Sequence, residues 1–300
     1  MKQLGVLVPI VTPCSKAGEP DLNGVKSVCG DFIEKECHGI FVCGSTGRGP
    51  WFSRSDQAKI CRAASDQVGS KIPLFAGCTG MGLPEMLENS AAMSDAGASG
   101  VVLTSPGYFN YSVSELETIF LKFADKSPLP VMIYDIPVFA GSKLNTDMIK
   151  RLAQHENVIG FKDSSADFER FKKLASELSN LPDFYLIQGK EHLIGEAILN
   201  GASGLTVSLV HINPGLFVNL YNAAVSGNSE LVSGLQNSVT GIMTLVVKCF
   251  ERRPEISTLF HFLNHAMKKR GVCNNILLEH EGECPGWIGE AADEAINIDI

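Results

Sequence analysis

Long apolar runs are missing from this 300-residue sequence. No stretch approaches the ~18 consecutive apolar residues that a membrane-spanning helix needs, so we expect no membrane partner. The N-terminal run MKQLGVLVPIVTP is short and is interrupted by Pro9 and Pro13, and no small-residue cleavage site follows it. We therefore expect no signal peptide and a cytoplasmic location.

A surplus of positive charge is also missing. The formal net charge is −8, and the Lys and Arg residues are scattered along the chain and form no stripe. Nucleic acids and anionic membranes are bound by clustered basic residues. The sequence therefore predicts neither as the main partner.

Metal-binding and disulfide patterns are absent as well. The nine cysteines include no C-x-x-C pair, and most lie in apolar surroundings, so we interpret them as reduced core thiols of a cytosolic protein. His261 and His265 have the spacing of H-E-x-x-H but lack its glutamate. His192 and His211 follow the last two apolar runs without a clear acidic partner. A metal-dependent mechanism is therefore the weaker alternative.

What the sequence does contain is a series of short apolar runs. They are residues 5–11, 39–44, 72–77, 100–105, 130–136, 158–163, 184–189 and 204–208. Each run is continuously apolar, which is typical of parallel strands that are buried on both faces. Amphipathic helical patterns separate the runs. Ser114 and Glu117 resemble a capping box for one of these helices, and Thr146 is a candidate N-cap for another.

Eight strands that alternate with helices predict an α/β protein with a (β/α)₈ TIM barrel. The alternative is a doubly wound open sheet, which the missing G-x-G-x-x-G turn after the first strand disfavours. We expect the barrel to span residues 1–225. Residues 226–300 would form a C-terminal helical extension of the same domain, because no Pro/Ser-rich linker separates them. The stretch from about residue 274 has no clear pattern.

Polar residues at the ends of the predicted strands are candidate catalytic groups, because barrel enzymes place their active sites there. They are Gly44 to Gly47, Tyr108, Tyr134, Lys162, Gly189 to Glu191, and Ser208. Burial would lower the pKa of a lysine, and the neutral amine can attack a carbonyl carbon and form a Schiff base. Tyr134 would relay the proton, and the hydroxyl and N–H groups of GSTG suit a carboxylate.

Each of these residues also has a structural interpretation. Lys162 could be a surface lysine just past its strand or an ion-pair partner of Asp163. Tyr134 could be an ordinary core tyrosine, and GSTGRG could be a glycine-rich turn.

Four motifs in this order resemble a known family. They are GSTG (44–47), YDIP (134–137), FKDSS (161–165) and GKE (189–191). Over residues 4–270 the chain resembles the dihydrodipicolinate synthase / N-acetylneuraminate lyase family of class I aldolases. The resemblance implies a covalent imine between pyruvate and Lys162 with no cofactor. It also implies a proton-relay role for Tyr134, and a carboxylate site at Ser45 and Thr46.

The strand-4 loop SPGYFNY resembles the family loop whose tyrosine reaches into a neighbouring subunit. Tyr108 is the best match and Tyr111 the alternative. The resemblance therefore implies a homotetramer built as a dimer of dimers.

Two departures from the family pattern bear on the substrate. Phe139 replaces the arginine with which synthases bind the carboxylate of their aldehyde, and Arg48 replaces the usual glutamate of GTTGE. The stretch GSTGRGP resembles 2-keto-3-deoxygluconate aldolases, and IPVFAGSKL (136–144) with Ser208 resembles sialic acid lyases. We expect the substrate to be bound by Gly47, Arg48, Phe139, Gly189, Lys190, Glu191 and Ser208.

The sequence thus predicts a lyase that cleaves or forms a 2-oxo-3-deoxy sugar acid from pyruvate and an aldehyde. N-acetylneuraminate lyase, dihydrodipicolinate synthase and a sugar-acid dehydratase are alternatives with the same chemistry. A barrel that has lost catalysis and only binds a small molecule is the alternative of a different class.

Overall fold

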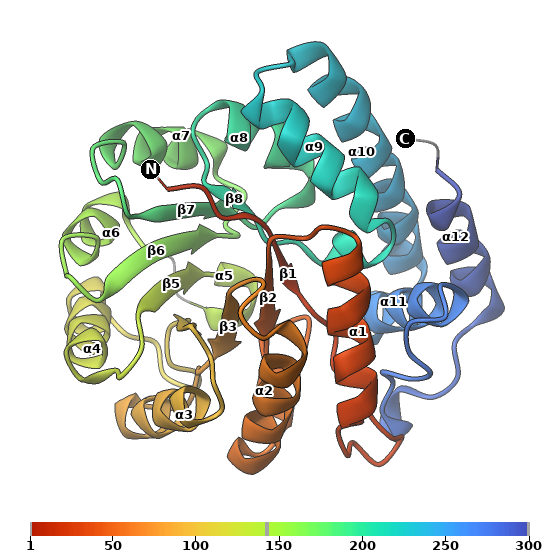
Figure 1. Ribbon diagram of the computed structural model, residues 1–300, viewed down its shortest axis with the longest axis horizontal. Helices are drawn as coiled ribbons and strands as arrows, with labels where there is room; N and C mark the ends of the chain where they lie inside the picture. The colour runs from red at the N-terminus through yellow and green to blue at the C-terminus, as the bar shows by residue number, and fades with distance from the viewer. Residues whose placement is uncertain (1, 142–143, 299–300) are drawn as a thin grey trace.

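The computed structural model describes residues 2–141 and 144–298 of the chain, and its centre is a closed barrel of eight parallel strands in chain order (Figure 1). The strands are β1 (Gly5–Pro9), β2 (Gly39–Val42), β3 (Leu74–Gly77), β4 (Gly100–Leu103), β5 (Val131–Asp135), β6 (Val158–Asp163), β7 (Tyr185–Gln188) and β8 (Gly204–Leu205). Pairing of β1 with β8 closes the barrel. The predicted barrel is confirmed, and the open-sheet alternative is wrong.

Helices surround the barrel on all sides (Figure 1). They are α1 (Leu22–Glu34), α2 (Arg54–Val68), α3 (Leu83–Asp95), α4 (Val113–Lys126), α5 (Pro137–Ala140), α6 (Thr146–Leu152), α7 (Phe168–Glu177), α8 (Ile194–Leu199), α9 (Pro214–Val225), α10 (Ser229–Arg252), α11 (Ser257–Lys269) and α12 (Gly286–Ile296). The last three pack against one another beside α1 and α9. Of the IPVFAGSKL motif, residues 142–143 lie outside the described part of the chain.

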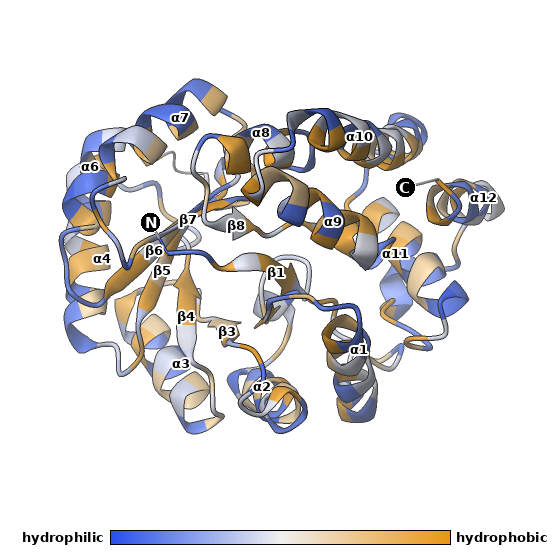
Figure 2. Ribbon diagram, turned by 45° about the horizontal axis from the view of Figure 1, so that its top comes forward, coloured by the Kyte–Doolittle hydropathy of each residue, from blue (hydrophilic) through white to orange (hydrophobic). Residues whose placement is uncertain are grey.

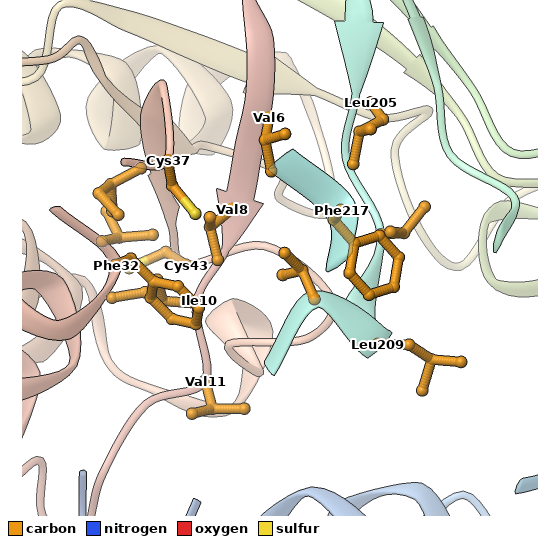
Figure 3. Packing of buried hydrophobic residues seen from close by; sticks show 14 of the residues in the cluster. Val6, Val8, Ile10, Val11, Phe32, Cys37, Cys43, Leu205, Leu209 and Phe217 are labelled. Atoms are coloured by element: carbon orange, nitrogen blue, oxygen red, sulfur yellow. The ribbon is translucent and has the colours of Figure 1, made fainter. Parts of the chain in front are cut away.

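The apolar residues form two layers, one inside the barrel and one between the barrel and its helices. In Figure 2 the strands are largely hydrophobic, and the surrounding helices carry both hydrophobic and hydrophilic residues. The inner layer includes Phe41 and Tyr134. Figure 3 shows part of the outer layer, where Val8 of β1 lies near Phe32 of α1, and Phe217 of α9 packs beside the same strand. Apolar residues therefore cover both faces of the strands, which explains why each strand has a continuously apolar sequence.

Some predicted element ends were wrong. The capping box of α4 is formed by Ser112 and Glu115, because the helix begins at Val113 and Ser114 already lies inside it. The sequence SVSELE contains two overlapping S-x-x-E patterns, and only the first one matches the start of the helix. In the same way, α6 is capped by Asn145, and Thr146 is its first residue.

No helix among the described residues has both the length and the apolar content needed to cross a membrane. Within the same residues, no group of three or more His, Cys, Asp and Glu side chains is placed to hold a metal ion. All nine cysteines are free thiols, and all but Cys284 are buried.

An arginine outside the barrel holds β5 and β6 together at the height of the candidate site. Tyr134 pairs with Lys162 in the strand register, and Asp135 pairs with Asp163 one position further. Side chains alternate along a strand, so the two aspartates face outward, where Arg170 of α7 contacts a carboxylate oxygen of each at 2.7 Å. All three side chains are at most 7% exposed.

Arg170→Met should therefore destabilise the protein strongly. Two buried carboxylates would lose their cation, and breaking a buried ion pair in this way costs about 3–5 kcal/mol. Urea unfolding would measure the loss in the free energy of unfolding. Arg151→Met is the control, because Arg151 pairs with Glu117 at the surface and such pairs contribute little. Equal unfolding midpoints for the two variants would contradict this interpretation.

Candidate active site

A cavity of about 370 Å³ opens where β2, β3, β4 and β5 end. Its inner wall includes Phe41, Ser45 and Tyr134, and its outer wall includes Phe139. The carboxyl ends of the strands are the face on which barrel enzymes bind their substrates. The position of the cavity therefore marks this end of the barrel as the candidate active site.

Lys162 lies directly behind this wall and is only 4% exposed. Its Nζ atom is 4.0 Å from the ring centroid of Tyr134 and 5.3 Å from that of Phe41. Among the described residues, no side chain forms an ion pair or hydrogen bond with it. Burial lowers the pKa of this amine from 10.5 to about 7, although the nearby Glu191 carboxylate opposes the change. A large fraction of Lys162 is thus neutral at neutral pH.

Tyr134 is the second buried polar group of the site. Its hydroxyl accepts a hydrogen bond from Ser164 Oγ at 3.5 Å and also interacts with Ser45. Burial raises the pKa of the phenol to about 12, and the two serine hydroxyls partly oppose this rise. Tyr134 is therefore a neutral phenol at pH 7, and its conjugate base would be a strong one.

The loop after β2 has a strained backbone that places Ser45 beside Tyr134. Cys43 has a φ of 55°, a left-handed conformation that costs energy for a residue with a side chain. Gly49 approaches so closely that a Cβ at this position would collide with the Cys43 carbonyl oxygen. Ser45 and Thr46 are half-buried, and Thr12 Oγ1 donates a hydrogen bond of 2.6 Å to the Gly47 carbonyl.

The ends of β7 and β8 supply further groups on the other side of Lys162. Gly189 leaves room for the lysine, since a Cβ there would lie 3.2 Å from Lys162 Cε and would collide with Ser164 Oγ. The Glu191 carboxylate accepts hydrogen bonds from Ser208 N at 3.2 Å and Ser208 Oγ at 3.0 Å. Lys190 lies between Gly189 and Glu191 in the same loop and is half-buried. These residues are thus brought to the same end of the barrel as Lys162.

Two residues expected in the site lie at its edge or outside it. Tyr108 is 86% exposed at the tip of the loop after β4. Arg48 turns away from the cavity and pairs with Glu281 Oε1 at 2.9 Å. The expectation that Arg48 binds substrate finds no support in this geometry, because its guanidinium pairs with Glu281 through Nη2 and does not line the cavity.

Sequence reasoning missed two hydroxyl groups that line the cavity. Thr79 and Thr104 follow β3 and β4, and their Oγ1 atoms lie 2.9 Å apart. Their position at or near the end of an apolar run was an available signal, because Thr104 lies in the run 100–105 and Thr79 is two residues past the run 72–77. The partner role of Ser164 toward Tyr134 had no such signal, because it depends on how β5 and β6 align.

A closed barrel of eight parallel strands with a cavity at their carboxyl ends defines the fold of this chain as a (β/α)₈ barrel. Residues 2–278 match the dihydrodipicolinate synthetase family. The chain belongs to this family of lyases.

Named relatives show the range of the family. The 4-hydroxy-tetrahydrodipicolinate synthase of Methanospirillum hungatei is 30% identical over 228 residues, which are 75% of this chain and 78% of the relative. A second relative is Escherichia coli YagE, which is named provisionally as a 2-dehydro-3-deoxy-D-gluconate aldolase. It is 28% identical over 240 residues, which are 79% of this chain and 80% of YagE. The crystal structure of YagE in complex with pyruvate has a TM-score of 0.89 over 99% of both chains, at 23% identity.

The lowered pKa of Lys162 predicts how Lys162→Met affects stability. An unfolded lysine titrates near 10.5 and the folded one near 7. The unfolded state therefore binds more protons between these values, and stability rises with pH across that window. The free-energy cost of burying the amine is therefore close to its maximum at pH 7 and small at pH 10.

We thus expect Lys162→Met to raise the free energy of unfolding at pH 7 by on the order of 3 kcal/mol and at pH 10 by less than about 1 kcal/mol. Urea unfolding of both proteins at both pH values would measure the difference. An equal effect at the two pH values would contradict the burial of an ionisable amine at this position.

Proposed function

We propose that this chain is a cytoplasmic, Schiff-base-forming aldolase that cleaves or forms a 2-oxo-3-deoxy sugar acid from pyruvate and an aldehyde. The observation that carries the proposal is the buried amine of Lys162, with its pKa near 7 and its Nζ 4.0 Å from the Tyr134 ring centroid. A neutral amine at neutral pH is the nucleophile that attack on a ketone requires. The covalent imine takes the place of a cofactor.

In the proposed reaction, the Lys162 nitrogen attacks the C2 carbonyl carbon of the 2-oxo acid. The former carbonyl oxygen leaves as water, and an iminium ion forms. Tyr134 donates the proton that this oxygen needs, because its high pKa keeps the phenol protonated until then. The phenolate then takes the proton of the C4 hydroxyl.

Loss of that proton breaks the C3–C4 bond. Its electron pair moves to the iminium nitrogen, the aldehyde leaves, and an enamine of pyruvate remains. Protonation of the enamine at C3 and addition of water release pyruvate and restore the amine. The reverse sequence forms the sugar acid, with the enamine attacking the aldehyde.

We assign the pyruvate carboxylate to the loop after β2. Ser45 interacts with the Tyr134 hydroxyl, so a carboxylate bound there would place the C2 carbon close to the phenol and to Lys162. The Ser45 and Thr46 hydroxyls and the backbone N–H groups up to Gly47 are the donors in our proposal. Preorganised donors of this kind hold an anion at little cost in reorganisation.

The acceptor end is assigned to Gly189, Lys190, Glu191 and Ser208 on one side and to Phe139 on the other. The hydrogen-bonded pair of Glu191 and Ser208 can receive and donate bonds to sugar hydroxyls. Phe139 is 60% exposed and is a cavity-lining residue. An apolar ring cannot form the ion pair that a carboxylate-bearing aldehyde requires, and this favours a sugar-acid aldolase over the synthase activity named for the Methanospirillum relative.

We also propose that the protein is a homotetramer formed by two dimers. Tyr108 and Phe109 expose 86% and 62% of their surfaces in one loop, and their rings contact each other edge to face with centroids 4.9 Å apart. An exposed aromatic tip on a left-handed backbone, with a φ of 76° at Tyr108, is a feature that a neighbouring subunit would bury. Sedimentation velocity should show a tetramer, and Tyr108→Ser should weaken the assembly. A wild-type monomer at micromolar concentration would refute the proposal.

Reduction with borohydride in the presence of pyruvate tests the chemistry. The expected product is a reduced pyruvate adduct on Lys162, detected by intact mass and located by peptide mapping. Lys162→Met should give no adduct, whereas Lys190→Met should still give one, because Lys162 is the amine buried inside the barrel and Lys190 is only half-buried in the loop after β7. No adduct on folded wild-type protein would reject the proposal in favour of a barrel that only binds a small molecule.

An acceptor panel then separates the alternatives with the same chemistry. Glyceraldehyde should be accepted if the protein is a 2-oxo-3-deoxy sugar acid aldolase. Turnover of N-acetylmannosamine alone would identify a sialic acid lyase, and turnover of aspartate semialdehyde alone would identify the synthase. Release of water from a sugar acid without C–C cleavage would identify a dehydratase.

A further inference from the structure

The loop that carries Ser45 and Thr46 is held from outside by the C-terminal segment of the chain. Arg48, at the end of this loop, pairs with Glu281 of the short helix η4 (Glu279–Glu281), 233 residues further along. The Arg48 and Glu281 side chains are 11% and 5% exposed. The match to the family ends at residue 278, so the partner of Arg48 lies beyond it.

A second group of contacts fixes the guanidinium of Arg48 in place. Its central carbon lies 3.6 Å from the ring centroid of Phe260 on α11. An arginine that stacks on a ring and pairs with a carboxylate is held in one orientation, which a lysine reproduces only in part. Glu281 is equally fixed, because its other carboxylate oxygen accepts a 2.8 Å hydrogen bond from Leu278 N.

Independent contacts join the same two segments on either side of the ion pair. Trp51, at the end of the short helix η1 (Gly49–Trp51), stacks on His280 with ring centroids 5.0 Å apart. Glu279 N also donates a 2.9 Å hydrogen bond to the Lys16 carbonyl in the loop after β1. The whole of η4 is therefore docked against the catalytic end of the barrel.

The backbone of the loop needs such support. Both Cys43 and Arg48 have left-handed conformations, with φ of 55° and 52°. Such conformations persist in residues with side chains only when their surroundings hold them. Thr12 holds the loop in the middle through the Gly47 carbonyl, and the Arg48–Glu281 pair holds its far end.

We propose that Arg48 and Glu281 are positioning residues. In this view they hold the loop after β2 in the conformation that binds the carboxylate of the 2-oxo acid, so that the C-terminal segment completes the active site. The inference rests on the proposed function, because it assigns the carboxylate to Ser45 and Thr46. The inference also gives a role to Arg48, which departs from the family pattern and does not line the cavity.

The test measures borohydride labelling of Lys162 as a function of pyruvate concentration. Glu281→Gln and Arg48→Met should raise the pyruvate concentration for half-maximal labelling about 10-fold, since small displacements of positioning groups have effects of this size or larger. The labelling rate at saturating pyruvate should stay near that of the wild type, because Lys162 and Tyr134 are untouched. Arg48→Lys keeps the charge but loses part of the stacking on Phe260, so it should raise this concentration less than Arg48→Met does.

Asp31→Asn is the matched control. It removes an ion pair of similar burial, with Arg270 at 2.5 Å, that joins α1 to the end of α11 and does not touch the loop. This variant should lose thermal stability comparable to that of Glu281→Gln and keep the wild-type dependence on pyruvate. Wild-type affinity in Glu281→Gln, or an equal loss in Asp31→Asn, would overturn the proposal.

Hydrogen exchange separates this inference from the proposed function. In the unliganded protein, the amides of residues 44–49 and of Trp51 should exchange faster in Glu281→Gln than in the wild type or in Asp31→Asn. If wild-type protein forms no adduct with pyruvate, the proposed function fails, while the exchange data still decide whether Glu281 holds the loop. Unchanged exchange at these amides would refute the positioning role whatever the labelling shows.

Discussion

Desolvation of one amine is the constraint on which the rest of this structure depends. Lys162 extends from β6 into the end of a closed barrel, where Phe41 and Tyr134 replace water around its Nζ atom. Closure of the barrel creates this environment, because it brings Phe41 of β2 and Tyr134 of β5 to the same lysine. Burial of an amine that forms no ion pair or hydrogen bond with the described residues costs stability. In our proposal the protein thereby gains a nucleophile that is ready at neutral pH.

The surrounding parts can be understood by how they hold that amine and its neighbours. Arg170 fixes β5 against β6 from outside, one position beyond the pair of Tyr134 and Lys162. Gly189 provides the space that the lysine stem needs. On the opposite side, η4 of the C-terminal segment supports the strained loop after β2 through Arg48. The site is therefore positioned by contacts with helices outside the barrel as well as by the barrel itself.

The local sequence pattern was sufficient to predict the barrel. The roles of residues that depend on contacts between distant parts of the chain could not be predicted from it. Strands buried on both faces are continuously apolar, so the eight runs could be recognised without a structure, as could a lysine at the end of one of them. The role of Arg48 could not, because its partner Glu281 is 233 residues away and no periodicity links the two. The capping box of α4 was misplaced for a different reason, since two overlapping patterns fit and only the packing of the helix selects Ser112.

The most direct test of this account is the pKa of Lys162 in the folded, unliganded protein. It can be measured by NMR titration of protein labelled with ¹³C at the lysine side chains, and the signal can be assigned with Lys162→Met. Desolvation inside the barrel predicts that the pKa of Lys162 lies near 7. A Lys162 pKa that stays at the ordinary value of 10.5 would contradict the account, because the amine would then be charged and solvated.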